Sequence, residues 1–332
     1  MCRWSGWHRF ALRRRSWVAT FSLMINCTSE SKSNIESAVI PVTLIAGYLG
    51  AGKTTLLNAY LRGGVTPGTL VLVNDFGTIN VDAELIDYAG EHLLKLSSGC
   101  LCCSLSDELG MQLSRIGRWP EPPAALIIET SGVARPNRIA DMIRVARRFS
   151  LDRIVTLVDL TSLAHRLDDS RIGELVANQI ASADKLSLNR GGCLDIVERE
   201  SLMRRLQLLN PTASVSYAGS STGSPVGPAP ARPMTLRRAG GEYDPDWQRF
   251  AINLPASLTR HTLESLLAEH VEGLARAKGF IQADGRHYIF QWSGGRAEWT
   301  PTASRLGTSQ LVGIGFAGEP FESLITALKA LV

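Results

Sequence analysis

The sequence contains Gly47-Tyr48-Leu49-Gly50-Ala51-Gly52-Lys53-Thr54, which fits the phosphate-binding P-loop pattern G-x-x-x-x-G-K-S/T. The apolar run Val42–Ala46 comes before it and predicts a buried strand, and the residues after Thr54 are typical of a helix start. In this order of strand, loop and helix, backbone N–H groups surround a phosphate, and the helix N-terminus adds partial positive charge. The stretch therefore predicts a nucleotide-binding domain built around a P-loop.

The P-loop also supplies most of the predicted nucleotide ligands. Lys53 is expected to reach the β- and γ-phosphates and to stabilise the transferring charge, and the Thr54 hydroxyl is expected to ligate Mg²⁺. Residues that follow later strands complete the set. The predicted nucleotide-binding residues are Gly47, Gly50, Ala51, Gly52, Lys53, Thr54, Thr55, Gly132, Asn189 and Arg190.

From residue 40 onward, short apolar runs alternate with segments of helical periodicity. Such alternation is typical of an α/β fold with a mostly parallel sheet and helices on both faces. Ligands of such sheets lie at the carboxyl ends of the strands. The predicted strands are Val42–Ala46, Thr69–Val73, Leu93–Leu96, Ala124–Ile128, Ile154–Val158 and Lys185–Leu188, and helices are predicted over Leu105–Ile116 and Ile139–Phe149.

Two acidic residues directly follow predicted strands and complete the catalytic candidates Lys53, Asp75 and Glu129. Asp75 lies where P-loop proteins sense the γ-phosphate, so it is expected to bind Mg²⁺ or its water, or to position the attacking water. A polar turn is the alternative interpretation. Glu129 occupies the Walker-B position and is expected to hold a water bound to Mg²⁺, while Gly132 offers a backbone N–H to the γ-phosphate. The alternative for Glu129 is an exposed carboxylate at a strand end.

Three of the six cysteines, Cys100, Cys102 and Cys103, fall within four positions. This spacing is unsuited to a disulfide framework and is typical of a metal site in a reducing compartment. At a helix N-terminus the thiol pKa values fall, which favours thiolates and metals such as Zn²⁺. Because Zn²⁺ usually takes four ligands, the fourth would be water, another side chain or a partner's thiol. Buried apolar cysteines are the alternative.

The segment after the Lys185–Leu188 strand departs from the base-recognition motif of guanine-specific P-loop proteins. Those proteins commonly carry N-K-x-D, in which the Asp pairs with guanine N1 and N2 and the Lys stem stacks on the base. Here Arg190 replaces the Lys, Gly192 stands in the place of the Asp, and Asp195 comes six residues after Asn189. Either a longer loop brings Asp195 to the base, or selection for guanine is weakened.

The charge distribution separates the N-terminal tail from the rest of the chain. Residues 1–29 carry five arginines and no acidic residue, whereas the remainder has 30 basic and 31 acidic residues and lacks the charge pattern of a nucleic-acid-binding protein. The sequence contains no run of about 20 apolar residues, so no membrane span is predicted, and a cytoplasmic protein is expected.

The predicted organisation is a disordered extension (1–38), a P-loop GTPase domain (39–217), a Ser/Gly/Pro-rich linker (218–246) and a small α+β C-terminal domain (247–332).

Within the C-terminal region, apolar patterning predicts a few strands and two helices. The predicted strands are Phe250–Leu254, Phe280–Gln282, His287–Trp292 and Gln310–Phe316, and the predicted helices are Leu258–Leu274 and Pro320–Leu331.

Taken in order, these motifs resemble the CobW-like family of P-loop metallochaperone GTPases, which joins a CobW/HypB/UreG nucleotide-binding domain to a CobW C-terminal domain. Members are relatives of the hydrogenase- and urease-maturation GTPases. The cysteine cluster between the P-loop and Walker B is the most specific feature. The resemblance runs from about residue 40 to the end and rests on Gly47–Thr54, Val73–Gly77, Gly99–Cys103 and Glu129–Gly132, with support from Arg276–Phe280.

The resemblance implies a GTPase that uses GTP and Mg²⁺ and binds Zn²⁺ or Co²⁺ at Cys100, Cys102 and Cys103. It also implies that the nucleotide state controls metal capture and release, with a client metalloenzyme as partner and a homodimer as one possible assembly. The family's switch usually reads Asn-Glu-Phe-Gly-Glu, whereas here Asp75 is shorter and Thr78 replaces the second acid. Residues 211–245 contain no histidine, so a metal-storing linker is not supported.

Three functional hypotheses follow. The first is a slow nucleotide hydrolase that delivers metal, and the second is a nucleotide- and metal-binding scaffold or sensor in which hydrolysis is incidental. The third is an ATP-using P-loop enzyme, either an ATP-preferring hydrolase or a small-molecule kinase. Turnover that rises with a metal acceptor would favour the first over the second, and competition between GTP and ATP would separate the first from the third.

Overall fold

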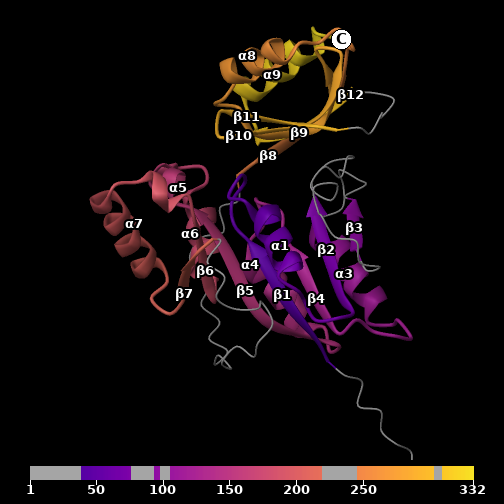
Figure 1. Ribbon diagram of the computed structural model, residues 1–332, viewed down its shortest axis with the longest axis vertical. Coiled ribbons are helices and arrows are strands. Elements are labelled where there is room, and N and C mark those ends of the chain that lie inside the picture. The colour runs from indigo at the N-terminus through magenta and orange to yellow at the C-terminus, as the bar shows by residue number, and fades with distance from the viewer. Residues whose placement is uncertain (1–38, 76–92, 98–104, 219–244, 303–308) are drawn as a thin grey trace, which may run out of the picture. The chain divides into compact units, whose positions relative to one another are not determined.

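The P-loop connects a strand and a helix of a sheet whose order is β3-β2-β4-β1-β5-β6-β7 (Figure 1). Every pairing between its described strands is parallel. The computed structural model describes residues 39–75, 93–97, 105–218, 245–302 and 309–332, and Ala38–Val332 form one compact unit. The strands are β1 (Ile40–Ala46), β2 (Thr69–Asp75), β3 (Leu93–Ser97), β4 (Ala125–Glu129), β5 (Phe149–Asp159), β6 (Lys185–Asn189) and β7 (Ser214–Tyr217).

Helices cover both faces of this sheet. Apolar residues of α1 share a cluster with Ile45 on one face, and those of α3 and α4 share a cluster with Leu44 on the other. The prediction of an α/β fold with a parallel sheet between helices is therefore confirmed. The helices are α1 (Lys53–Arg62), α3 (Leu105–Ile116), α4 (Pro136–Val145), α5 (Leu160–Asp168), α6 (Gly173–Ala181) and α7 (Ile196–Leu209), with a short 3₁₀ helix η1 (Gly191–Cys193).

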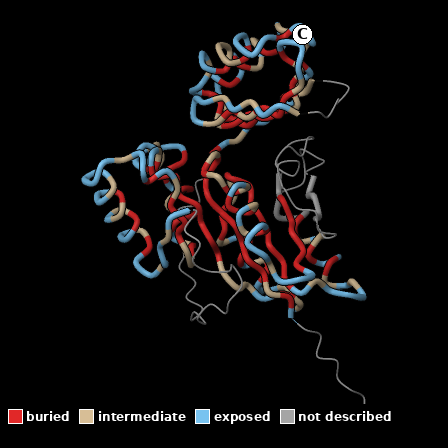
Figure 2. The backbone as a smooth tube through the Cα atoms, viewed as in Figure 1, coloured by how far each residue is buried: buried red, intermediate tan, exposed pale blue. Residues whose placement is uncertain are grey.

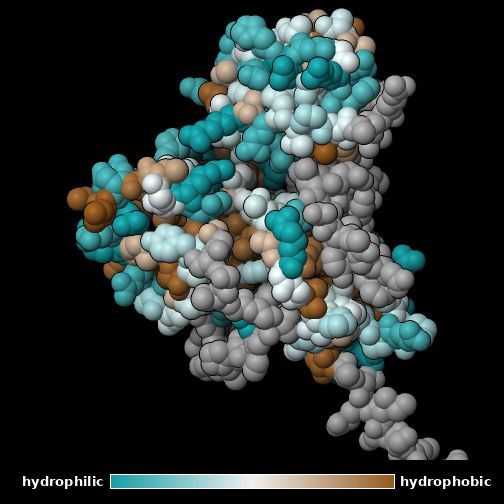
Figure 3. All heavy atoms as spheres, in the orientation of Figure 1, coloured by the Kyte–Doolittle hydropathy of each residue, from teal (hydrophilic) through white to brown (hydrophobic). Residues whose placement is uncertain are grey.

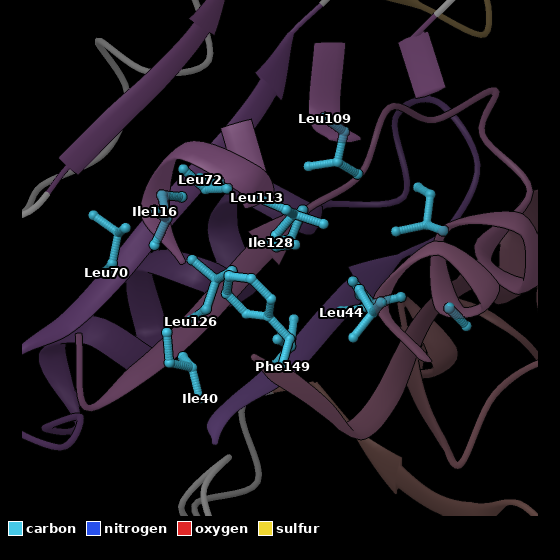
Figure 4. Packing of buried hydrophobic residues seen from close by; sticks show 14 of the residues in the cluster. Ile40, Leu44, Leu70, Leu72, Leu109, Leu113, Ile116, Leu126, Ile128 and Phe149 are labelled. Carbon is cyan, nitrogen blue, oxygen red and sulfur yellow. The ribbon is translucent and has the colours of Figure 1, made fainter. Parts of the chain in front are cut away.

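Strand β1 lies at the centre of the core because its side chains are buried on both faces. Val42 and Leu44 pack on the side of α3 and α4, and Ile45 packs on the side of α1. Figure 4 shows the first of these clusters, to which β1, β2, α3, β4 and β5 all contribute. Figure 2 shows the buried stretches along the strands and the exposed residues on the helices. A strand buried on both faces has a continuous apolar sequence, which explains why β1 was predictable.

The residues from Trp247 onward form an antiparallel sheet with the order β11-β10-β9-β12-β8. Helices α8 and α9 pack together, and their apolar residues share a cluster with Phe290 and Leu311 of the sheet. The predicted α+β character of this region is confirmed. Its elements are β8 (Trp247–Leu254), α8 (Arg260–Glu269), β9 (Leu274–Ala283), β10 (Arg286–Ser293), β11 (Arg296–Pro301), β12 (Ser309–Phe316) and α9 (Glu319–Lys329).

The helix predicted over Leu258–Leu274 is wrong at both ends, because α8 is shorter. At its start, the Thr259 hydroxyl accepts a hydrogen bond of 3.1 Å from the Thr262 N–H and so caps the helix. Beyond its end, a Cβ atom at Gly273 would lie 2.6 Å from the carbonyl carbon of Pro320. The next residue, Leu274, is already the first residue of β9, so the predicted helix does not extend that far.

The helix predicted over Ile139–Phe149 is wrong at its C-terminal end. α4 ends at Val145, and Phe149 is instead the first residue of β5, where it packs into the apolar cluster. An apolar residue at the start of a buried strand continues a helical spacing by coincidence. Strand β11 was not predicted, because it is the edge strand of its sheet and most of its side chains are at least partly exposed.

The described surface is mostly hydrophilic on the face that Figure 3 shows, with separate apolar spots. Val145, Ile196 and Leu208 are among the exposed large apolar residues of the described chain. None of the described helices combines the length and the apolar character that crossing a membrane requires.

Candidate nucleotide and metal site

The P-loop links the end of β1 to the start of α1 and depends on glycine for its shape. Gly52 precedes α1 with a φ of 100°, a left-handed conformation that glycine adopts without steric cost. Gly47 has a φ of 132°, and a Cβ atom there would collide with the carbonyl oxygen of Leu157 on β5. The two glycines therefore let the loop turn against the carboxyl end of the sheet and present the N-terminus of α1, which favours anions.

Lys53 begins α1 and is almost completely buried, with only 5% of its surface exposed. Its Nζ donates hydrogen bonds to the carbonyl oxygen of Gly47 at 2.9 Å and to that of Tyr48 at 3.3 Å. The backbone of the loop thus holds the ammonium group in place. From this position a P-loop lysine reaches the β- and γ-phosphates of a nucleotide.

Thr54 and Glu129 connect the P-loop to the end of β4. The Thr54 hydroxyl donates a hydrogen bond of 3.0 Å to Oε1 of Glu129. Strand β4 is the neighbour of β1, and Ile45 pairs with Glu129, so the sheet register brings the carboxylate beside the loop. Glu129 is 3% exposed, which excludes the solvent-exposed carboxylate that the sequence left open. A hydroxyl and a carboxylate oxygen in this arrangement fit Mg²⁺, which prefers oxygen ligands and is often held by one or two carboxylates plus substrate phosphates.

The residues after Glu129 lie directly against the P-loop. A Cβ atom at Gly132 would lie 2.7 Å from the backbone nitrogen of Leu49, so only glycine permits this approach. Gln179 of α6 holds the turn, because its Nε2 donates a hydrogen bond of 3.0 Å to the carbonyl oxygen of Gly132. No motif marks Gln179 for this role, although it is almost completely buried on α6 among mostly apolar residues.

Asn189 and Arg190 lie at the end of β6, on the other side of the P-loop. Nδ2 of Asn189 donates a hydrogen bond of 3.1 Å to the carbonyl oxygen of Ala51 and thereby supports the loop. Arg190 has a φ of 57°, and its Nη1 donates a hydrogen bond of 2.6 Å to Oδ2 of Asp159 at the end of β5. The two strand ends are therefore joined by an ion pair that sequence reasoning did not predict.

Asp159 is held in place by a second set of contacts. Its Oδ1 accepts hydrogen bonds from the N–H of Thr161 at 3.1 Å and from the Thr161 hydroxyl at 2.8 Å, which caps α5. Burial acts to raise the pKa of Asp159, but the hydrogen bond from Thr161 and the charges of Arg190 and Arg166 outweigh it and hold the pKa below its usual value. Asp159 is therefore ionised at neutral pH.

Asp195 does not contribute to the base end of the site, which is the part beside Arg190 where the base of a nucleotide is expected. Its Oδ1 accepts a hydrogen bond of 2.8 Å from the Glu198 N–H, and Oε2 of Glu198 accepts one of 3.4 Å from the Asp195 N–H. The pair forms a capping box at the start of α7. The interpretation that a longer loop brings Asp195 to the base is therefore wrong. An acidic residue three positions before Glu198 was a sequence signal for this cap.

The phosphate end and the base end of the site share one cavity of about 410 Å³, a volume within the range of small-molecule sites. Arg276 and Gln291 of the antiparallel sheet also line it, and Nη2 of Arg276 donates a hydrogen bond of 3.0 Å to Oε1 of Gln291. Asp159, Thr161 and Arg166 line the cavity although no motif marks them. Of the predicted residues, the cavity brings together Gly50, Gly52, Lys53, Thr54, Thr55, Glu129 and Arg190.

The sequence matches two family profiles. Residues 41–216 match the CobW/HypB/UreG nucleotide-binding domain, and residues 247–332 match the cobalamin synthesis protein cobW C-terminal domain. The chain belongs to this family. The resemblance inferred from the order of the motifs is thereby confirmed.

Relatives of this CobW-family chain include three curated proteins. Zinc chaperone CobW of Sinorhizobium sp is 26% identical over 295 residues, which cover 74% of this chain and 82% of that protein. Zinc chaperone YjiA of Escherichia coli is 28% identical over 269 residues, which cover 74% of this chain and 83% of that protein. Zinc-regulated GTPase metalloprotein activator 1 of Schizosaccharomyces pombe is 34% identical over 174 residues, which cover 49% of this chain and 41% of that protein. A crystal structure of Zn(II)-bound YjiA GTPase from Escherichia coli aligns over 89% of this chain and 99% of that chain, with 23% identity and a TM-score of 0.39.

The predicted metal ligands of this CobW-family chain, Cys100, Cys102 and Cys103, lie outside the described residues. Asp75 is the last residue of β2, and the prediction for its side chain also lies outside what the structure describes. Within the described ranges, no group of three or more His, Cys, Asp or Glu residues is arranged to hold a metal ion. The cysteine site therefore stays a prediction.

Proposed function

We propose that this chain is a GTP-binding and GTP-hydrolysing metallochaperone. It binds zinc or cobalt at Cys100, Cys102 and Cys103 and passes the metal to a client metalloprotein under the control of the bound nucleotide. The observation that carries the proposal is the 3.0 Å hydrogen bond between Thr54 of the P-loop and the buried carboxylate of Glu129. The closeness of these two oxygens supports a shared role in holding the Mg²⁺ of a P-loop hydrolase.

Binding of the phosphates rests on the start of α1. The backbone N–H groups of the loop and the partial positive charge of the helix N-terminus attract the phosphate oxygens. Lys53 adds a full positive charge, and its amine is already held over the loop by the carbonyl oxygens of Gly47 and Tyr48. These groups need little reorganisation when charge moves onto the phosphate oxygens in the transition state.

Thr54 and Glu129 would hold Mg²⁺, with the hydroxyl as a direct ligand and the carboxylate acting through a bound water. The ion held there would supply positive charge that neutralises the phosphate oxygens. The protein's own contribution is to fix the two oxygens in a buried setting, where electrostatic interactions are less screened than in water.

The order of three neighbouring strands supports control of the metal by the nucleotide. β2 pairs with β4 on one side and with β3 on the other, and Asp75 pairs with Ser97 at their carboxyl ends. Adjacent strands are about 4.8 Å apart, so the end of β3 lies about 10 Å from that of β4. Cys100 follows Ser97 by three residues, which span at most about 11 Å. A change at the γ-phosphate is therefore close enough to alter the spacing of the thiols.

Zinc is the favoured cargo, because the relatives bear the names zinc chaperone and zinc-regulated GTPase metalloprotein activator. The same names support a client metalloprotein as the partner that receives the metal. A cysteine thiolate suits Zn²⁺ and other soft or borderline metals better than it suits Mg²⁺ or Ca²⁺. The chain thus keeps the two metals apart by ligand type, with oxygen at the P-loop and sulfur at the cysteine cluster.

Exchange of Glu129 for glutamine tests the hydrolytic part of the proposal. We expect Glu129→Gln to lower the rate of phosphate release from GTP by about 10- to 100-fold and to raise the Mg²⁺ concentration needed for half-maximal activity. The neutral amide keeps the size of the side chain but loses the charge that attracts the ion. The measurement is phosphate release over a series of Mg²⁺ concentrations.

The matched control is Glu322→Gln, which removes an exposed carboxylate from α9. This variant should hydrolyse GTP like the unmodified protein. Equal rates and equal Mg²⁺ dependence for Glu129→Gln and the unmodified protein would contradict the assigned role of Glu129.

A further inference from the structure

The segment after β6 has an exposed glycine at the position where guanine-specific P-loop proteins have a carboxylate. Gly192 lies in η1, three residues after Asn189, and is exposed. A Cβ atom built on it meets nothing within 4 Å, and its φ is not positive. No packing or backbone constraint therefore demands glycine at this position, and a larger side chain would fit.

Selection of guanine requires a group that accepts two hydrogen bonds. The Watson–Crick edge of guanine presents the N1–H and the exocyclic N2 amine as donors, and a carboxylate with two accessible oxygens accepts both. Adenine presents an acceptor at N1 and has no amine at position 2. A site without such a carboxylate loses the two hydrogen bonds that distinguish the N1–H and the two-position amine of guanine from the corresponding edge of adenine.

The nearby carboxylates on the parallel sheet are already engaged. Asp195 and Glu198 complete each other's hydrogen bonds in the capping box of α7. The side chain of Asp159 is 2% exposed, and its two oxygens accept hydrogen bonds from Thr161 and Arg190. A carboxylate so deeply buried cannot present both oxygens to the edge of a base.

Arg190 can contact a base without reading its two-position amine. Its side chain is 38% exposed, and its guanidinium is oriented by the ion pair with Asp159. A planar guanidinium stacks on the face of any base, because every base has a π-face. Arg190 thus replaces the stacking function of the usual lysine and adds no preference for the two-position amine of guanine.

We propose that this site binds guanine and adenine nucleotides with similar affinity, and that the absence of a carboxylate at position 192 is the cause. The inference rests on the proposed nucleotide-binding function and deepens it by widening the substrate class from GTP to purine nucleotides in general. The phosphates and their Mg²⁺ then supply most of the affinity. The base contributes stacking alone.

The test uses isothermal titration of the full chain with GDP, ADP and IDP in the presence of Mg²⁺. IDP keeps the six-position carbonyl of GDP and lacks its two-position amine, so the three ligands separate the two features of guanine. We expect their dissociation constants to lie within about threefold of one another, since position 192 carries no carboxylate and those of Asp159 and Asp195 are engaged elsewhere. Gly192→Asp should tighten GDP by about tenfold or more over both ADP and IDP, because hydrogen bonds to a charged group are among the stronger ones.

The matched control is Gly192→Asn, which has nearly the same size and no charge. Its amide offers one acceptor and a donor that faces the donors of guanine, so it should not create a preference for GDP. Gain of selectivity in the aspartate variant alone would support the proposal. Failure of Gly192→Asp to favour GDP over IDP would overturn the assignment of position 192.

Results on the unmodified protein separate the inference from the function on which it rests. A preference for GDP of about tenfold or more over ADP would overturn the inference and leave the proposed function intact. If IDP followed GDP, the six-position carbonyl would be read, by Arg190 for example. If IDP followed ADP, another acceptor such as Glu298, which also lines the cavity, would read the amine. Absence of binding by all three nucleotides would overturn the proposed function itself.

Discussion

Replacing Lys53 with alanine is expected to lower GTP turnover by at least about a hundredfold and to weaken nucleotide binding. The lysine ammonium lies over the P-loop, 2.9 Å from the carbonyl oxygen of Gly47, and is shielded from solvent. Alanine removes the positive charge from the position that faces the β- and γ-phosphates, and the methyl group that remains cannot replace it. Phosphate release and titration with GDP would measure the two effects.

Two further variants make this result specific to the lysine at that position. Lys53→Arg keeps the positive charge but carries a larger, planar group that is not interchangeable with an ammonium, so it should also lose most of the turnover. Lys329→Ala removes an exposed lysine from the last turn of α9 and should leave turnover unchanged. A Lys53→Ala protein that is folded and fully active would contradict the assignment of the P-loop as the phosphate site.

Exchange of Cys100, Cys102 and Cys103 for serine is expected to weaken zinc binding by about a thousandfold or more. A thiolate is both negatively charged and polarisable, whereas a serine hydroxyl stays protonated at neutral pH and binds Zn²⁺ poorly. GDP binding should be retained, because the residues that line the P-loop cavity are unchanged. Competition with a chromophoric zinc chelator would measure the affinity of both proteins.

Cys193→Ser is the control for this series. Cys193 is exposed and lies in η1, apart from the predicted cluster in the sequence. The variant should bind zinc as tightly as the unmodified protein. Tight zinc binding that survives the loss of Cys100, Cys102 and Cys103 would show that the metal uses other ligands.

The arrangement of the phosphate site was largely predictable because it depends on local sequence and on sheet geometry. The P-loop pattern follows an apolar run that is buried on both faces, and Glu129 follows a second such run. The carboxyl ends of parallel strands meet at one edge of the sheet. The sequence pattern and the sheet geometry together predict that Glu129 lies near Thr54, and the structure shows the hydrogen bond between them.

The base end was less predictable, because its residues are brought together by contacts far apart in the sequence. Asp159 and Arg190 are separated by 31 positions, and at the phosphate end Gln179 likewise reaches the carbonyl oxygen of Gly132 over 47 positions. Neither pair has a motif. The assignment of Asp195 failed for a different reason, since a local capping box competes for the carboxylate and the order of residues alone does not reveal which partner wins.

Helix ends were the least predictable features of the fold. The spacing of apolar residues continues past the end of α4 into β5, although the chain has already left the helix at Val145. Just beyond α8, Gly273 lies close against Pro320, a tertiary contact that periodicity does not encode. Patterns therefore identify elements well and locate their boundaries poorly.

Control of metal affinity by the nucleotide is the central claim, and one measurement tests it most directly. Zinc affinity would be measured by chelator competition on reduced protein with Mg²⁺, once with a non-hydrolysable GTP analogue and once with GDP. If the γ-phosphate reorders the segment that follows β2, the two affinities should differ by about 5- to 150-fold, the usual range for coupled sites. The Cys100, Cys102 and Cys103 serine variant should show no such difference. Zinc affinities that agree within about twofold in the two nucleotide states, well below that range, would contradict nucleotide control of the metal.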